Sequence, residues 1–304
     1  MAGPITTGSH PKALWPGVHA FWGQTYAEHS AEYVDLFEED TSEKAYEEDV
    51  QITGFGLAPI KAEGAAVTYD YEVQGTVSRY THIAYALGYI VTYEELKDNL
   101  YDVVSMRRAK ANAFSIAQTV ETVCAATYNN AFDTAYPVAD GAALLSASHT
   151  QATGGTYSNL LSPAADLSEA ALEDLSIQIM GTTTDRGLNI NLMPQSLHVP
   201  RQEWYNANRI LQSVLQSGTA NNDINVLKAV NAFPKGIKMN HYLTSSTRWF
   251  VRTNCPNGMM LYWRDKPMFD QDNDFDTKNA KSATYFRFSV GNTDPRGIYG
   301  SNAP

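Results

Sequence analysis

Apolar side chains recur at helical spacing along residues 89–136, the longest stretch that contains neither glycine nor proline. Thr92 followed by Glu95 forms a capping box, which is typical of a helix start. The pattern predicts a helix over 93–130, with a break near 98–99 that would leave a short helix before a long one. The apolar positions are Leu96, Leu100, Val103, Val104, Phe114, Ala117, Val120, Cys124 and Tyr128.

A period of two dominates residues 69–82, YDYEVQGTVSRYTH. The alternation predicts a two-stranded hairpin whose turn lies at Gln74 and Gly75. Such a ribbon is marginal in water unless a third strand or a helix covers its apolar face. The sequence next to it offers no covering element.

Helix and strand patterns alternate again after a loop-rich stretch at 133–162. A helix is predicted to begin near Ser168, a strand covers 195–199, and Pro200 suits the first position of a third helix. Together they predict a compact α/β unit at 163–235. The inner face of the third helix would carry Trp204, Ala207, Leu211 and Val214.

The two ends of the chain differ in pattern. Residues 1–50 begin with prolines, glycines and polar residues and end in the acidic run FEEDTSEKAYEED, so we expect an extended arm with a solvated acidic face. After residue 235 the period changes to two. TRWFVRT, MMLYWR and TYFRFSV predict strands that cover one flank of the long helix.

The composition is that of a folded protein, with 43% hydrophobic residues in a chain of 304. A net charge of −11 argues against binding nucleic acid by neutralising phosphates, which requires clustered lysine and arginine. The N-terminal stretch lacks the apolar run of a secretory signal, and no segment approaches membrane-spanning length. We therefore expect a soluble protein made in the cytoplasm.

Residues that could carry chemistry are dispersed. The seven histidines form no HExxH motif and no i, i+4 pair, and no nucleophile elbow, Walker loop or dinucleotide fingerprint is present. Cys124 and Cys255 match no metal-ligand spacing and are expected to be buried small hydrophobes. The sequence predicts no catalytic residue, no cofactor and no metal site.

An Asp-rich segment, DQDNDFD at 270–276, partly matches a calcium loop. Its aspartates alternate from Asp270, but Phe275 and Lys281 stand where an EF-hand has its turn glycine and its bidentate glutamate. A solvated hairpin loop is the better interpretation. Weak Ca²⁺ binding and a glycosidase pair of carboxylates stay open from sequence alone.

Several stretches, taken in this order, carry a family resemblance: YALGYIVTYEELKDN, DGAALLSASH, GGTYSNLLS, LSEAALEDL, HVPRQEWYNANRILQS, TRWFV and NTDPRGIYGS. With the order of arm, hairpin, long helix, α/β unit and closing strands, they resemble the major capsid protein of tailed bacteriophages, which has the Hong Kong 97-type fold. The resemblance covers about residues 20–301.

The resemblance implies an α+β fold with five parts. These are an N-terminal arm at 1–50, an extended loop formed by the hairpin at 51–90, a peripheral domain with a spine helix at 91–162, an axial α/β domain at 163–235, and closing strands of the peripheral domain at 236–304. In the family, the extended loop lies across a neighbouring subunit.

This placement makes a set of residues candidates for subunit contacts: Lys61, Tyr69, Tyr71, Val73, Arg79, Tyr80, Arg107 and Arg108. Tyr69 and Tyr71 could bury aromatic area against a neighbour or, alternatively, pack under the arm of their own subunit. Arg107 and Arg108 could pair with the acidic arm of this or an adjacent chain. Lys61 is the candidate in this loop for the cross-link to a neighbour's asparagine that some family members form.

The resemblance also implies the partners. Copies of the chain would form pentamers and hexamers of an icosahedral shell in the virion, enclosing double-stranded DNA without sequence-specific contacts, assembled in the host cytoplasm and without a membrane. A portal is a further expected partner, a separate scaffolding protein is expected unless assembly needs none, and the sequence leaves open whether a decoration protein binds. Two alternatives stay open: an encapsulin-like shell around an enzyme cargo, and a cytoplasmic metal-dependent hydrolase using the Asp-rich loop with His149 or His241.

Overall fold

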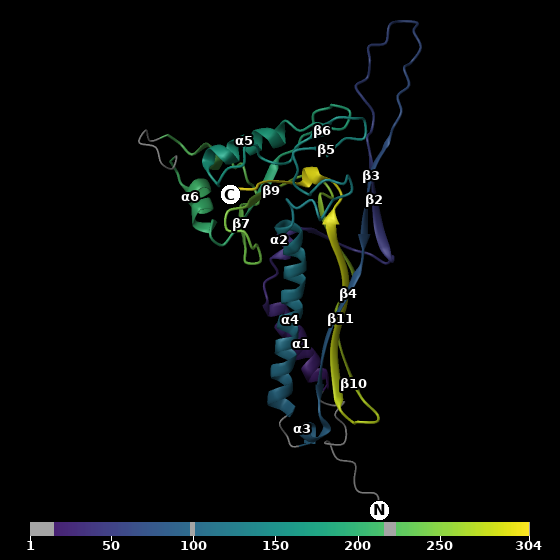
Figure 1. The fold of residues 1–304 in the computed structure, drawn as a ribbon, viewed down its shortest axis with the longest axis vertical. Helices are drawn as coiled ribbons and strands as arrows, with labels where there is room; N and C mark the ends of the chain where they lie inside the picture. Colours follow the sequence, from purple (N-terminus) through teal and green to yellow (C-terminus); the bar gives the residue numbers. More distant parts are fainter. Residues whose placement is uncertain (1–14, 98–100, 216–222, 304) are drawn as a thin grey trace, which may run out of the picture.

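The computed structural model describes residues 15–97, 101–215 and 223–303 (Figure 1). The helices are α1 (Trp15–Glu28), α2 (Tyr33–Leu36), α3 (Tyr93–Lys97), α4 (Tyr101–Asn129), α5 (Glu169–Met180), α6 (Trp204–Gln212) and α7 (Val226–Ala229), with a 3-10 turn at Pro295–Gly297. The strands are β1 (Glu38–Thr41), β2 (Tyr46–Ile52), β3 (Gln74–Thr81), β4 (Ile83–Val91), β5 (His149–Thr150), β6 (Thr156–Tyr157), β7 (Pro194–Pro200), β8 (Ile237–Asn240), β9 (Trp249–Thr253), β10 (Met259–Asn273), β11 (Ala280–Asn292) and β12 (Ile298–Ser301).

The lower part of the molecule in Figure 1 is a helix layer packed on a sheet. The sheet has the order β1-β10-β11-β4, with β1 parallel to β10 and the other pairs antiparallel. Along β11, Phe286 and Phe288 are buried whereas Tyr285 points outward, as the two-residue period of a half-buried strand requires. α1 lies along α4, where the indole N–H of Trp22 donates to Asn112 at 2.9 Å.

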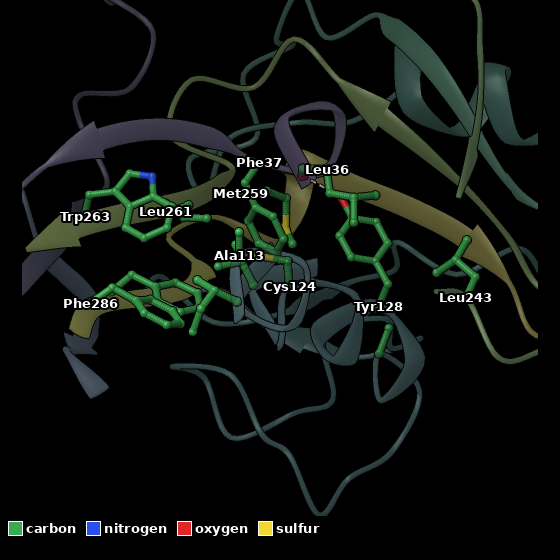
Figure 2. Close-up of a cluster of buried hydrophobic side chains, with 14 of the residues drawn as sticks. Leu36, Phe37, Ala113, Cys124, Tyr128, Leu243, Met259, Leu261, Trp263 and Phe286 are labelled. Atoms are coloured by element: carbon green, nitrogen blue, oxygen red, sulfur yellow. Dashed lines mark hydrogen bonds between the residues drawn. The ribbon is translucent and has the colours of Figure 1, made fainter. Parts of the chain in front are cut away.

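α4 supplies the spine of the main hydrophobic core (Figure 2). Its buried positions recur every three or four residues, as expected for one face of a helix: Ala109, Ala113, Ile116, Val120, Cys124 and Tyr128. The Tyr128 hydroxyl donates to the carbonyl of Leu36 at 2.8 Å, which ties α2 to the helix. The predicted long helix is confirmed over 101–129, and α3 is the short helix expected before it. The expected break at 98–99 lies outside the described residues.

The upper part is the α/β unit, whose sheet has the order β12-β9-β7-β8. Ser168 caps α5 by accepting from the Ala171 N–H at 3.3 Å, and β7 includes the predicted strand, so both local predictions are confirmed. The predicted start of the third helix is wrong, because Pro200 ends β7 in the sheet and α6 begins only at Trp204. Val214 therefore lies beyond α6 and is exposed.

The sheet of this unit draws strands from beyond residue 235. β9 and β12 pair with each other and β9 pairs with β7, so the strand TRWFV belongs to the sheet of the α/β unit. It meets the long helix at the end of α4, where the ring of Phe250 packs on that of Tyr128 at 5.3 Å. β10 and β11 cover a flank of the long helix, as predicted. The division of the chain into arm, extended loop, peripheral domain and axial domain stays a prediction.

The N-terminal segment is not the extended solvated arm that we expected from its composition. Within residues 15–50 it forms α1, α2, β1 and the start of β2. Asp40, Glu43 and Glu48 are exposed, as expected, whereas Asp49 and Glu39 have partners far along the chain. The Asp49 carboxylate accepts from the hydroxyls of Thr293 at 2.7 Å and Tyr262 at 3.2 Å, and Glu39 accepts from the Trp263 indole at 3.3 Å.

The predicted hairpin at 69–82 is also wrong in its pairing. β3 pairs with β2 in antiparallel register, with Val50 opposite Val77 and Ile52 opposite Gln74. Gly75 occupies the ladder rather than a turn, and a Cβ atom there would lie 3.2 Å from Cβ of Gln51. The covering partner of β3 is thus the strand YEEDVQI, read from sequence as arm.

Candidate subunit-interface surface

A long loop, residues 53–73, connects β2 to β3 and projects from the rest of the molecule (Figure 1). Thr53 and Val73 close its base, because the Thr53 N–H donates to the Val73 carbonyl at 3.1 Å and the Val73 N–H donates to the Thr53 hydroxyl at 3.0 Å. No helix or strand forms between them.

Asp70 joins the two legs of this loop. Its carboxylate accepts from the backbone N–H groups of Gly56 and Tyr71, both at 2.8 Å, and these bonds lower the pKa of Asp70. Arg186, in the turn that follows α5, donates to the Tyr71 carbonyl and lies 3.8 Å from the Asp70 carboxylate. The base of the loop is therefore tied to the α/β unit, and this contact sets the direction in which the loop projects.

The loop exposes an unusual number of apolar side chains. Ile60 is 102% exposed, Tyr69 91% and Leu57 85%. The remaining large exposed apolar residues of the loop are Phe55, Val67 and Tyr71. Apolar side chains scattered singly need no explanation, but a concentration on one projection marks an interaction site.

The outward face of the ribbon continues this surface. Val50 and Val77 lie opposite each other on β2 and β3 and are both exposed, as is Ile52. Arg79 lies on the same face, 3.7 Å from Glu48 and with its guanidinium 3.9 Å from the ring centre of Tyr46. The ribbon therefore presents an apolar strip with one cation at its lower end.

A hollow of about 630 Å³ opens beside this strip. Val77 and Ile83 line one side, Val123 and Ala126 of α4 line another, and Tyr136 closes the rim. Arg79 is the only charged residue among its described lining residues, which include no histidine, cysteine or carboxylate. The hollow suits apolar contact rather than acid–base chemistry.

The candidate contact residues chosen from sequence differ in exposure. Lys61, Tyr69, Tyr71 and Arg79 are exposed on the loop and ribbon, Val73 is half-buried at the loop base, and Arg107 is exposed on α4. Arg108 pairs within the chain, because its guanidinium donates to both carboxylate oxygens of Glu95 at 3.0 and 2.8 Å. Within the chain Arg108 therefore pairs with Glu95 rather than with the acidic arm, and its pairing with the arm of an adjacent chain stays a prediction.

Tyr80 is the other correction. Its side chain is 3% exposed, its hydroxyl lies 2.7 Å from that of Thr293, and its ring contacts Tyr262 at 4.9 Å. It belongs to a small core between the ribbon and β10, where burial raises its pKa. The sequence around Tyr80 could not reveal its burial, because β10, the strand that covers it, is far away in sequence.

The groups that a hydrolase would need lie apart. His149, in β5, is fully buried between the Asp140 carboxylate at 2.7 Å and the Asn159 amide oxygen at 3.0 Å. The Asp-rich end of β10 is at the opposite end of the molecule in Figure 1, and there Asp274 pairs with Lys281 at 2.7 Å. His241 pairs with Glu32 at 2.6 Å. Across the described ranges, no three acidic, histidine or cysteine side chains are placed to hold a metal ion.

A family model described as phage capsid protein matches residues 75–301. The chain belongs to the phage capsid protein family. This family is structural rather than enzymatic, which agrees with the absence of catalytic motifs in the sequence and argues against the hydrolase alternative. No curated protein matches this capsid protein in sequence.

Solved structures resemble this phage capsid protein in fold at low identity. A virus-like particle from Pyrococcus furiosus aligns with a TM-score of 0.56 and 11% identity, covering 94% of this chain and 98% of that one. The capsid of an empty GTA particle gives 0.56 and 10%, covering 100% and 93%. The procapsid of bacteriophage JBD30 gives 0.50 and 15%, covering 99% and 77%. The fold is the Hong Kong 97-type fold that the sequence resemblance implied.

No helix in the described ranges is long and apolar enough to cross a membrane. Among the described residues, the candidate contact surface of this capsid protein is formed by residues 53–73 and the outward face of β2 and β3.

Proposed function

We propose that this protein is the major subunit of a phage head, many copies of which assemble as pentamers and hexamers into an icosahedral shell around double-stranded DNA. Membership of the phage capsid protein family over residues 75–301 is the observation that carries the proposal. The exposed apolar loop supports it, because a structural protein of this kind gains its assembly energy from area buried between subunits.

The extended loop supplies contacts between neighbouring copies. Tyr69 and Tyr71 each offer on the order of 150–250 Å² of aromatic area to a neighbour. Ile60 and Leu57 add aliphatic area at the loop tip, and Lys61 lies beside them. The alternative is that these tyrosines pack under the arm of their own subunit. The near-complete exposure of Tyr69 in the single chain favours contact with a neighbour instead.

The shell encloses DNA without recognising its sequence. The net charge of −11 is opposite to that of a protein that neutralises phosphates, so contacts with packaged DNA would be few and non-specific. A portal, a separate scaffolding protein and a decoration protein are proposed partners, assembly takes place in the host cytoplasm, and the finished protein is located in the virion capsid.

Electron microscopy and light scattering on the protein expressed alone, at several salt concentrations, test this proposal. Closed shells, capsomer rings or tubes are the expected result. Co-expression with the neighbouring genes for a scaffold comes next if the chain alone stays monomeric. A chain that remains a monomer or dimer under both conditions would overturn the proposal.

A further inference from the structure

A buried carboxyl group lies where α4 meets the junction between α1 and α2. Glu121, on α4, is 5% exposed, and its Oε1 accepts the backbone N–H of Glu32 at 2.7 Å. Its Oε2 is buried and has no hydrogen-bond partner among the described residues. An ionised oxygen left unpaired in such a place is costly.

Glu121 also lines a cavity of about 100 Å³ beneath this junction. The described lining residues include no lysine or arginine, so no permanent cation there compensates a negative charge on Glu121. They are Tyr26, His29, Ser30, Ala31, Tyr33, Ala117, Gln118, Glu121 and Tyr242.

The other titratable and charged groups around Glu121 come from every element packed at the junction. They are Tyr26 and His29 at the end of α1, Glu32 before α2, Tyr33 and Asp35 in α2, Glu39 in β1, Cys124 in α4, and His241 and Tyr242 after β8. Glu32 accepts from both the backbone N–H and the ring of His241, at 2.8 and 2.6 Å, and Asp35 pairs with Lys238 at 2.9 Å. The neighbouring carboxylates therefore have partners of their own, whereas Glu121 Oε2 has none in this part of the structure.

We propose that Glu121 is a proton switch that docks the α1–α2 junction on α4 when it is protonated and loosens the junction when it is ionised. Docking holds Glu32 and Asp35 against His241 and Lys238, which belong to the segment around β8. The switch therefore controls how firmly the N-terminal helices are tied to the α/β unit.

The electrostatics give the direction of the switch. Burial is the main cause that raises the pKa of Glu121 from 4.5 to about 7, the carboxylates of Glu32 and Asp35 add to it, and the N–H groups of Glu32 and Tyr33 oppose it. Because the docked pKa is the higher one, docking takes up a proton. The stabilisation of the docked junction is complete below the unperturbed pKa of 4.5 and is lost as the pH rises through about 7.

Hydrogen exchange of residues 20–37 tests the switch in the unassembled chain. Wild type and Glu121→Gln, whose neutral amide mimics the protonated acid, are compared at the same pH so that the intrinsic exchange rate cancels. We expect equal rates near pH 5 and, near pH 8, faster exchange in wild type by up to about a hundredfold. Glu94→Gln, at an exposed position of α3, is the matched control and should behave as wild type.

Equal exchange in wild type and Glu121→Gln at the higher pH would overturn the proposal. A second measurement needs no variant: the ¹³C NMR shift of the Glu121 carboxyl carbon in wild type is followed against pH. A midpoint close to 7 supports the switch. A midpoint at the ordinary glutamate value of about 4.3 overturns it. Neither experiment depends on shell formation.

Discussion

Tyr128 shows how much a single buried polar atom contributes to this fold. It is fully buried, and its hydroxyl satisfies the Leu36 carbonyl at the end of α2. We expect Tyr128→Phe to lower the free energy of unfolding by about 1–3 kcal/mol, because the carbonyl loses its partner without access to water. Urea unfolding of the unassembled chain measures this. Tyr205→Phe, at a side chain that is 78% exposed, should change little and serves as the control.

His198 makes the free energy of unfolding fall as the pH falls, whereas Glu121 makes the docked junction less stable as the pH rises. Burial, helped by the charges of Arg252 and Lys238, lowers the pKa of His198 from 6.5 to about 3, so the ring is neutral in the fold. The unfolded chain binds a proton below about pH 6.5, and stability is therefore lost as the pH falls from there towards 3.

Replacing His198 should remove this loss. Between pH 7 and pH 5 we expect wild type to lose about 2 kcal/mol more stability than His198→Gln, whatever the stability of the variant at neutral pH. Urea unfolding at the two pH values gives the difference. Parallel curves for the two proteins would show that His198 is not the group responsible.

At the scale of elements, an ion pair among the described side chains links α3 to α4. The Arg108 guanidinium donates two hydrogen bonds to the Glu95 carboxylate, and both side chains are partly exposed. We expect Arg108→Glu to lower the free energy of unfolding by about 0.5–1 kcal/mol and the swap Arg108→Glu with Glu95→Arg to restore most of it. Arg107→Glu, one residue away and exposed, should have no such effect. Equal losses in Arg108→Glu and the swapped protein would contradict this assignment.

The elements predicted well are those whose signals are local. Ser168 caps α5 through its own neighbours, and the buried positions of α4 repeat within the helix. The pairing of β3 was mispredicted because its cause is not local. Gln74-Gly75 resembles a turn, but Gly75 lies in the ladder, where a Cβ atom would be in tight contact with Gln51. Asp49 in β2 looks solvated from sequence, but Tyr262 and Thr293, more than two hundred residues away, donate hydrogen bonds to it.

The difference between local signals and long-range contacts also decides which interface residues could be predicted. Tyr69 and Tyr71 were found from their alternation with acids, and their exposure fits a contact role that stays a prediction. Tyr80 lies on the opposite face of β3 from Val77 and is buried against Tyr262 of β10, and Arg108 of α4 pairs with Glu95 of α3. Leu57 and Ile60 follow neither a helix period nor a strand period, because the projecting loop that carries them has no regular secondary structure.

At the scale of the whole molecule, residues 55–68 bury little apolar area against the rest of the chain. Their large apolar side chains are exposed, while the hydrogen bonds that fix the loop direction lie at its base, at Thr53, Val73 and Asp70. Replacing 57–68 with a short glycine and serine linker should therefore leave the free energy of unfolding within about 0.5 kcal/mol, as for surface changes away from the core.

The same replacement should strongly reduce shell yield, because it removes the exposed apolar area of Leu57, Ile60 and Val67 that neighbouring copies could bury, while Tyr69 and Tyr71 remain. Sedimentation and electron microscopy compare it with wild type under conditions in which wild type assembles. Lys61→Ala, which removes a charge but leaves the apolar tip, is the matched control and should still assemble. Shells of normal yield from the linker variant would show that the loop is not the main contact between copies, whereas loss of assembly with unchanged stability would assign the assembly energy to it.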